Sequence, residues 1–188
     1  MNSGAHSAYH QIVVGGKLKN PSNSHVVVNE KVYAGSWQGK FNFNGGVQKI
    51  NDLSDVPELD FAHYEWLARN MKSSIANGKK VIVKNTGTDG SRNGCYDLYD
   101  FRSGGQGYDN GNTLVVFNTT DDICLTKTTD GRQFGPSVLA PFSKVTLTRA
   151  GFIDGTVIAK EFTTVDGQYK GTELQLHGSN YNGQIECI

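Results

Sequence analysis

The sequence carries no net charge, because its 18 basic side chains balance 18 acidic ones. A chain without a net positive field has no long-range attraction for phosphates. It also lacks any apolar run near the roughly 18 residues that a membrane-spanning helix needs. The sequence therefore predicts neither a nucleic-acid-binding protein nor a chain that spans a membrane within these 188 residues.

Cysteine is scarce, and the three present are far apart: Cys95, Cys124 and Cys187. They show no C-x-x-C spacing and are too scattered for a zinc ribbon. Cys95 and Cys124 could pair across neighbouring strands, which would leave Cys187 without a partner. Bridged and reduced states are equally open at this point, and a Cα separation above about 7 Å would exclude the bridge.

Catalytic signatures are missing as well. The sequence has no G-x-S-x-G elbow, H-E-x-x-H pair, Walker loop or dinucleotide fingerprint. Hydrolysis on a β-rich scaffold usually needs converging carboxylates. The adjacent Asp121 and Asp122 would instead point to opposite faces of a strand, or cap a turn. We therefore expect no enzyme.

What the sequence does have is glycine, at 23 positions, together with many short segments rich in β-branched residues. These segments cover residues 11–18, 25–33, 80–84, 113–118, 123–127, 137–139, 144–148, 155–159 and 173–176. Their apolar centres recur at roughly the spacing of solenoid coils, although a sandwich or jelly roll would also give many short strands. We expect a mainly β protein, an irregular β-solenoid, in one domain over residues 1–188.

One segment has helical periodicity. Its apolar residues are three or four positions apart and so fall on one helix face: Phe61, Tyr64, Ala68, Met71 and Ile75. Acidic side chains precede this segment, basic ones end it, and Gly78 follows where a helix C-cap is favoured. We predict one long helix over residues 58–77 that buries these five side chains against a sheet.

Several strands also carry residues of a known family. Residues 135–160, GPSVLAPFSKVTLTRAGFIDGTVIAK, resemble the motif GSxLAPxAxVxLxxGxIxGxVIAxxF of the choice-of-anchor A domain. Residues 13–18, 111–116 and 176–183 are similar to its VGGNL, GNxLVVN and LHxxxFxG segments. The resemblance implies a secreted or surface-displayed adhesive domain with an ice-binding-protein-like fold, a discontinuous right-handed β-solenoid with one helix alongside. The partners it implies are an extracellular surface, a matrix protein or a glycan.

The polar insert of residues 86–110 departs from the family pattern and contains a loop with the spacing of a calcium site. Counted from Asp89, oxygen-bearing side chains stand at positions 1, 3, 5, 9 and 12, glycine stands at 6, and position 7 offers a carbonyl. The candidate ligands are Asp89, Ser91, Asn93, Cys95, Asp97 and Asp100. Asp-Gly and Asn-Gly pairs are also common in ordinary turns. Calcium is the one cofactor that the sequence suggests, and its expected role is structural.

Two kinds of surface are candidates for binding. Thr146 and Thr148 alternate on one strand, and Thr156 is expected beside them on the next coil, as in the threonine arrays that bind ice. Exposed aromatic rings would instead serve a glycan, and those in polar surroundings include Trp37, Tyr96 and Tyr99. We expect a noncatalytic adhesion or cell-envelope module, secreted or on the cell surface. Glycan or small-ligand binding is the alternative, and ice binding the third possibility.

Overall fold

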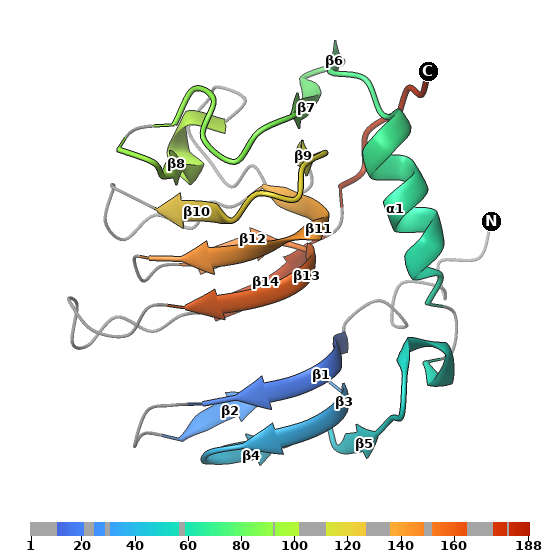
Figure 1. Ribbon diagram of the computed structural model, residues 1–188, viewed down its shortest axis with the longest axis vertical. Helices are drawn as coiled ribbons and strands as arrows, with labels where there is room; N and C mark the ends of the chain where they lie inside the picture. The colour runs from blue at the N-terminus through green and yellow to red at the C-terminus, as the bar shows by residue number, and fades with distance from the viewer. Residues whose placement is uncertain are drawn as a thin grey trace. The chain divides into compact units, whose positions relative to one another are not determined.

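The computed structural model describes residues 11–20, 25–28, 31–56, 59–91, 93–101, 112–126, 136–148, 152–164, 175–179 and 181–188. Over these residues the chain is mainly β with one α-helix, as the sequence predicts. It divides into two compact units, Met1–Phe61 and Ala62–Ile188. Figure 1 labels the elements of both. That residues 1–188 act as one domain stays a prediction.

The first unit consists of parallel strands in two sheets. One sheet has the order β1 (Gln11–Lys19), β3 (Lys31–Gln38) and β5 (Val47–Lys49), and the other pairs β2 (Val26–Val28) with β4 (Phe41–Phe43). The chain alternates between the sheets, so each strand pairs with the next but one in sequence. Both sheets contribute to a small core around Val28, Val32 and Ala34.

A glycine-rich irregularity interrupts β1. Its register with β3 shifts between Val14 and Lys17. A Cβ on Gly35 would stand 2.8 Å from the carbonyl oxygen of Gly16, so only glycine permits this approach of the two backbones. The predicted strand 11–18 is confirmed, and the predicted strand 25–33 contains β2 and the start of β3.

The second unit is a larger stack whose described strand pairs are parallel, apart from that of β6 (Ser74–Ala76) with β7. Its main path runs through β7 (Lys79–Lys84), β9 (Thr113–Phe117), β11 (Ser137–Leu147) and β13 (Val157–Thr164). Beside the second half of β11 lie β10 (Ile123–Thr126) and β8 (Tyr96–Asp97). A separate parallel pair joins β12 (Phe152–Gly155) to β14 (Gln175–Ser179).

Apolar side chains in register build the core of this unit. Val115 on β9 is the Cα partner of Val138 on β11, and Ile123 on β10 is the partner of Val145 further along β11. All four are at most 1% exposed. Burial of apolar area contributes roughly 25 cal/mol per Å². The stack thus forms because the inward residues of one strand meet apolar residues of the next.

The two predicted strands around Pro141 are one strand in the structure. The register of β11 with β13 shifts between Ala140 and Lys144, on either side of the proline. Proline has no N–H to donate to a ladder, so the pairing breaks there while the strand continues. The expected corner is therefore a local irregularity of β11.

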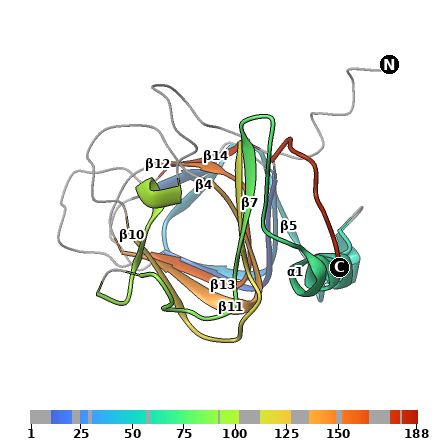
Figure 2. The same ribbon diagram turned by 90° about the horizontal axis from the view of Figure 1, so that it is seen from above.

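Helix α1 (Phe61–Asn70) is shorter than the predicted segment 58–77. Ala68 and the neighbouring Met71 are buried with Val81 of β7, and Tyr64 packs against the same cluster, so the expected contact between helix and sheet is confirmed. Figure 2 shows α1 outside the strands of its unit, on the side of β7. Phe61 is only half-buried.

The prediction was wrong for Ile75, which is 83% exposed. Residues 74–76 form β6 and turn back on β7 through Asn77 and Gly78, whose φ angles are +52° and +74°. Positive φ at both central residues is typical of a two-residue hairpin, and Asn-Gly is its preferred sequence. Gly78 therefore belongs to a hairpin turn, and the helix ends before it.

Candidate functional site

The outward face of β10, β11 and β13 carries a set of threonines. Thr146 on β11 lies between its Cα partners, Cys124 on β10 and Thr163 on β13. Its neighbours Val145 and Leu147 are buried, and side chains alternate along a strand, so Thr146 points outward. The three strands run side by side in Figure 1. We name this surface the threonine face, and its members are Thr126, Thr146, Thr148 and Thr163.

The threonine face has the spacing of a parallel sheet. Neighbouring strands lie about 4.8 Å apart, and alternate residues on one strand about 6.6 Å apart. The hydroxyl of Thr148 donates to the carbonyl of Leu125 at 3.1 Å, which holds that side chain against the sheet. All four threonines are half-buried. Together they present a row of hydroxyl groups on the outward side of the sheet.

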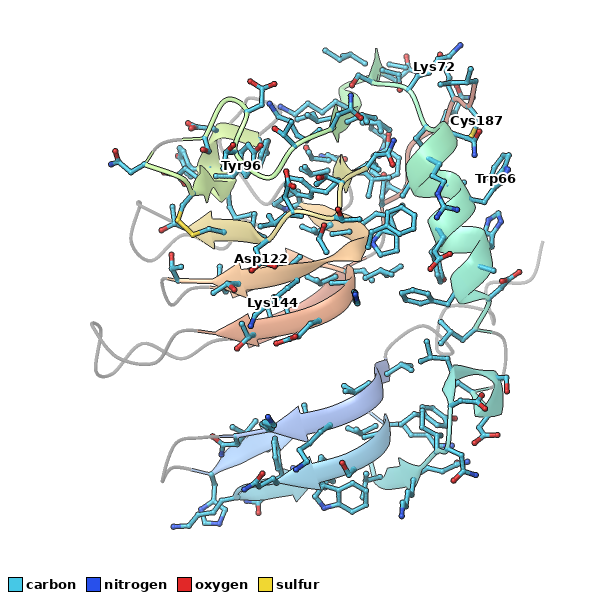
Figure 3. All side chains as sticks on the ribbon, viewed as in Figure 1. Trp66, Lys72, Tyr96, Asp122, Lys144 and Cys187 are labelled. Carbon is cyan, nitrogen blue, oxygen red and sulfur yellow. A yellow bond between two sulfur atoms is a disulfide. The ribbon has the colours of Figure 1, made fainter. Side chains whose placement is uncertain are left out.

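One ion pair borders this face. Lys144 and Glu161 are Cα partners on β11 and β13, and the Lys144 Nζ lies 3.1 Å from the Glu161 Oε1 (Figure 3). Both side chains are exposed, so the pair contributes at most about 1 kcal/mol to stability. Its main effect is that the two charges cancel on the surface.

Thr156 does not join Thr146. Its N–H donates to the Ser137 Oγ at 3.3 Å and its carbonyl accepts from the Val138 N–H at 2.8 Å, which places it beside the first half of β11. Thr163 is the residue beside Thr146, because β13 continues beyond residue 159, where the predicted strand ended. The alternation of Glu161 and Thr163 about an apolar Phe162 was the signal that would have found it.

Tyr96, one of the three aromatic candidates, is a core residue. It is 2% exposed, with ring centroids 5.9 Å from Phe101 and 5.3 Å from Phe117. Its hydroxyl donates to the carbonyls of Thr86 at 3.1 Å and Asp89 at 2.9 Å. Burial raises the pKa of the Tyr96 phenol above its usual value. This ring is therefore unavailable to a sugar.

The other two aromatic candidates lie in different units. Trp37 on β3 is 41% exposed, and its ring meets Phe43 edge-on with centroids 5.8 Å apart. Tyr99 is half-buried in a short 3-10 turn, Leu98–Phe101. Of the three predicted aromatic residues, only Trp37 has a largely accessible ring. That ring packs against Phe43, which borders the core of the first unit.

Cys95 and Cys124 are joined by a disulfide, with their Cα atoms 4.5 Å apart. The bridge predicted as one of two outcomes is confirmed, and Cys187 is the free, exposed cysteine. Because Cys124 is the Cα partner of Thr146, the bridge ties the loop before β8 to the edge of the threonine face.

The calcium-like loop does not gather its carboxylates. An Asp97 oxygen accepts from the Tyr99 N–H at 3.0 Å, and the Asp97 side chain is 4% exposed. The Asp89 carbonyl accepts from the Lys84 ammonium at 3.2 Å. Nowhere in the described residues do three or more His, Cys, Asp or Glu side chains form a group able to hold a metal. The loop as it stands does not fit calcium.

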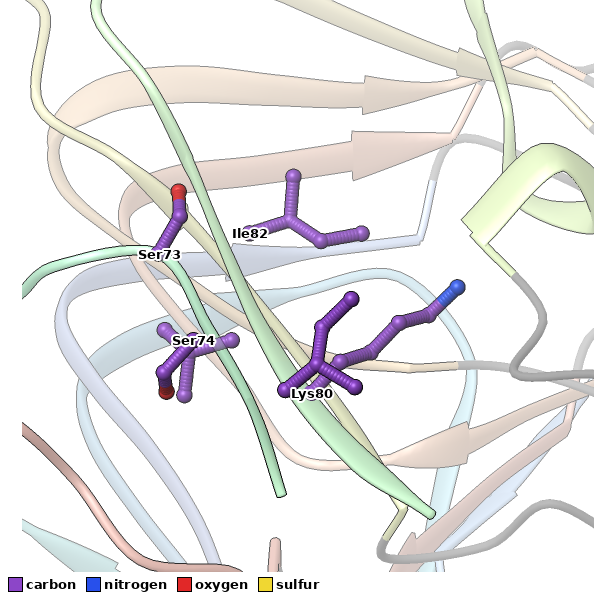
Figure 4. A pocket seen from close by; sticks show the side chains of 6 residues that line it. Ser73, Ser74, Lys80 and Ile82 are labelled. Carbon is purple, nitrogen blue, oxygen red and sulfur yellow. The ribbon is translucent and has the colours of Figure 1, made fainter.

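A shallow hollow of about 540 Å³ lies beside the β6–β7 hairpin (Figure 4). Its lining residues are Ser73, Ser74, Ile75, Lys80, Val81 and Ile82. Of these only Lys80 is titratable, so the hollow offers no acid and base together.

The part of the chain that the structure describes contains no helix with the length and apolar character of a membrane span.

Comparison with known proteins identifies the family. A family model described as "Putative Ice-binding-like adhesive domain" matches residues 34–171. No curated protein and no solved structure gives a significant match. The matched segment is most of the chain, and it runs from β3 through β13 and includes the whole threonine face. The chain therefore belongs to the ice-binding-like adhesive domain family.

Proposed function

We propose that the protein is a noncatalytic adhesion module, secreted or displayed on a cell surface, that binds a matrix protein or glycan of another surface. The observation that carries this proposal is the family match over residues 34–171. The disulfide agrees with it, because such bridges persist in oxidising, extracellular surroundings.

The proposal includes the finer fold. In both units the chain returns to pair with an earlier strand in parallel, and such crossovers are right-handed in nearly all proteins. This supports a right-handed, discontinuous β-solenoid with α1 alongside. The narrower assignment to the choice-of-anchor A domain rests on the motif in residues 135–160 and is part of the same proposal.

We place the binding surface on the threonine face. Its hydroxyls both donate and accept, and the Lys144–Glu161 pair at its border is neutral as a pair. The test is binding of the labelled full chain to a glycan array and to immobilised collagen and fibronectin. Replacing Thr146 and Thr163 together by Lys should weaken binding by about tenfold or more, since two rigid hydroxyls would be lost and two charges added.

The control is Thr88→Lys, which makes one such change at an exposed residue outside the strands, and it is compared with Thr146→Lys alone as well as with the double variant. It should bind like the unmodified chain. Equal binding by the control and the double variant would contradict the threonine face as the adhesive surface. Absence of binding to every probe by the unmodified chain would contradict the adhesive function itself.

Ice binding is a second candidate, favoured by the pairing of Thr146 with Thr163 on adjacent strands. The Lys144–Glu161 pair beside them interrupts the regular array that organises ice-like water. Thermal hysteresis of the unmodified chain would support this candidate, and its absence at millimolar protein would exclude it.

A further inference from the structure

Helix α1 exposes two aromatic rings on the side away from its sheet. Trp66 is 49% exposed and His63, one turn before it, is also exposed. Their rings are inclined by only 12°, with centroids 6.2 Å apart. Figure 3 shows Trp66 projecting from α1 away from the strands. The packing of the helix does not need these rings, because Ala68 and Met71 already face the core.

The rim of this pair is small and mixed, since Ile188, which is 83% exposed, donates its N–H to the Asn70 carbonyl at 2.8 Å. One turn to either side of Trp66 on the same helix surface lie the exposed Ala62 and the amide of Asn70, whose Nδ2 donates to the Trp66 carbonyl at 2.7 Å. The Arg69 guanidinium is turned away, 4.4 Å from the centroid of the Phe142 ring. An aromatic side chain buries at most about 250 Å², so two partly exposed rings supply only part of the roughly 800 Å² that each partner of a stable protein interface buries.

That pattern matches one ring of a sugar. A pyranose with equatorial hydroxyls has a flat C–H face of about the area of an indole and a rim of hydroxyl groups. The C–H face stacks on an aromatic ring, and the hydroxyls meet water or amides at the edge. We propose that His63 and Trp66 form a stacking platform for a pyranose of a surface polysaccharide. The biological purpose of this platform rests on the proposed adhesive function.

The two tryptophans of the chain permit a direct test. In a Trp37→Phe variant, Trp66 is the only indole, and in a Trp66→Phe variant, Trp37 is. The probes are soluble cellohexaose and chitohexaose, titrated into each variant. We expect the Trp66 emission to shift to the blue and its quenching by acrylamide to fall, with no change for Trp37. In the otherwise unmodified chain, Trp66→Ala should weaken binding about tenfold.

An unchanged Trp66 emission with both sugars up to about 10 mM would overturn the platform, since the sugar would then gain less than about 2.7 kcal/mol on binding, too little for a useful attachment. A response from Trp37 alone would overturn it too. Loss of adhesion in the threonine-face variant together with a silent Trp66 would overturn the platform and leave the adhesive function standing. A Trp66 response in a chain that adheres to no surface would support the platform and contradict the adhesive function.

Discussion

Single residues explain why the polar insert is ordered over the part that the structure describes. Tyr96 is buried and donates to two carbonyls of its own loop, and Cys95 next to it is bonded to Cys124 of β10. The sequence pattern assigned oxygen ligands to this loop. The structure holds it instead through one aromatic ring and one covalent bond. An aromatic residue in a polar segment was the signal, because such a ring gains most from burial.

We predict that the Cys95–Cys124 bridge stabilises the chain by about 3 to 4 kcal/mol, the loop-closure value for cysteines 29 residues apart. Urea unfolding of the double variant Cys95→Ser, Cys124→Ser would measure this loss. The matched control, Cys187→Ser, should change the free energy of unfolding by less than about 0.5 kcal/mol. Thiol titration of denatured, unreduced protein should give one thiol; three would show that the bridge does not form.

Calcium binding by the same loop can be tested with melting curves. A structural ion would raise the melting temperature in calcium over that in chelator, because it binds only the folded chain, and Asp89→Ala would remove the difference. The separated carboxylates lead us to expect equal curves. A higher melting temperature in calcium would mean that the loop rearranges around the ion.

At the scale of the element, the segment after Asn70 decides between helix and hairpin. We predict that Met71→Asp lowers the free energy of unfolding by about 3 kcal/mol or more, because Met71 is 4% exposed and the charge would be buried without a partner. Ile75→Asp, the matched change at an 83% exposed position, should cost less than about 0.5 kcal/mol. Equal losses in urea unfolding would show that the helix continues to Ile75.

The two halves of this segment show what periodicity can and cannot predict. The spacing from Phe61 to Met71 identified the helix and its buried face correctly. Ile75 has the same spacing by coincidence and lies outside the helix. Asn77 and Gly78 favour a hairpin turn there, because few other residue pairs adopt two positive φ angles in succession. The short strands β9 and β10 were placed to within one residue at each end, whereas β13 continues five residues past the predicted end at residue 159.

At the scale of the whole molecule, the sequence did not allow us to predict which strands pair. Apolar runs at Val115, Val138 and Val145 predict strands, but they are chemically alike. Nothing local states that β9 pairs with the first half of β11 and β10 with the second. Which strands pair depends on the apolar area that all the strand pairs bury together. The pairing of β13 with β11 is what places Thr163 on the threonine face.

We predict slow folding from the same topology. Most strand pairs are parallel and join residues about twenty or more positions apart, as Leu114 and Ser137 are, so loop closure precedes each gain in contact. Stopped-flow refolding followed by far-UV circular dichroism should give time constants of milliseconds to seconds. Complete refolding in microseconds would contradict the parallel arrangement.

The disulfide gains a mechanical meaning in a protein that holds a cell to a surface. Under tension an unfolded chain extends by at most about 3.6 Å per residue, but the residues between Cys95 and Cys124 cannot lengthen while the bond is intact. A pulled molecule would therefore stop roughly 100 Å short of the length that it reaches after reduction. In an adhesive protein under force, the redox state of the Cys95–Cys124 bond would therefore set how far the chain can extend.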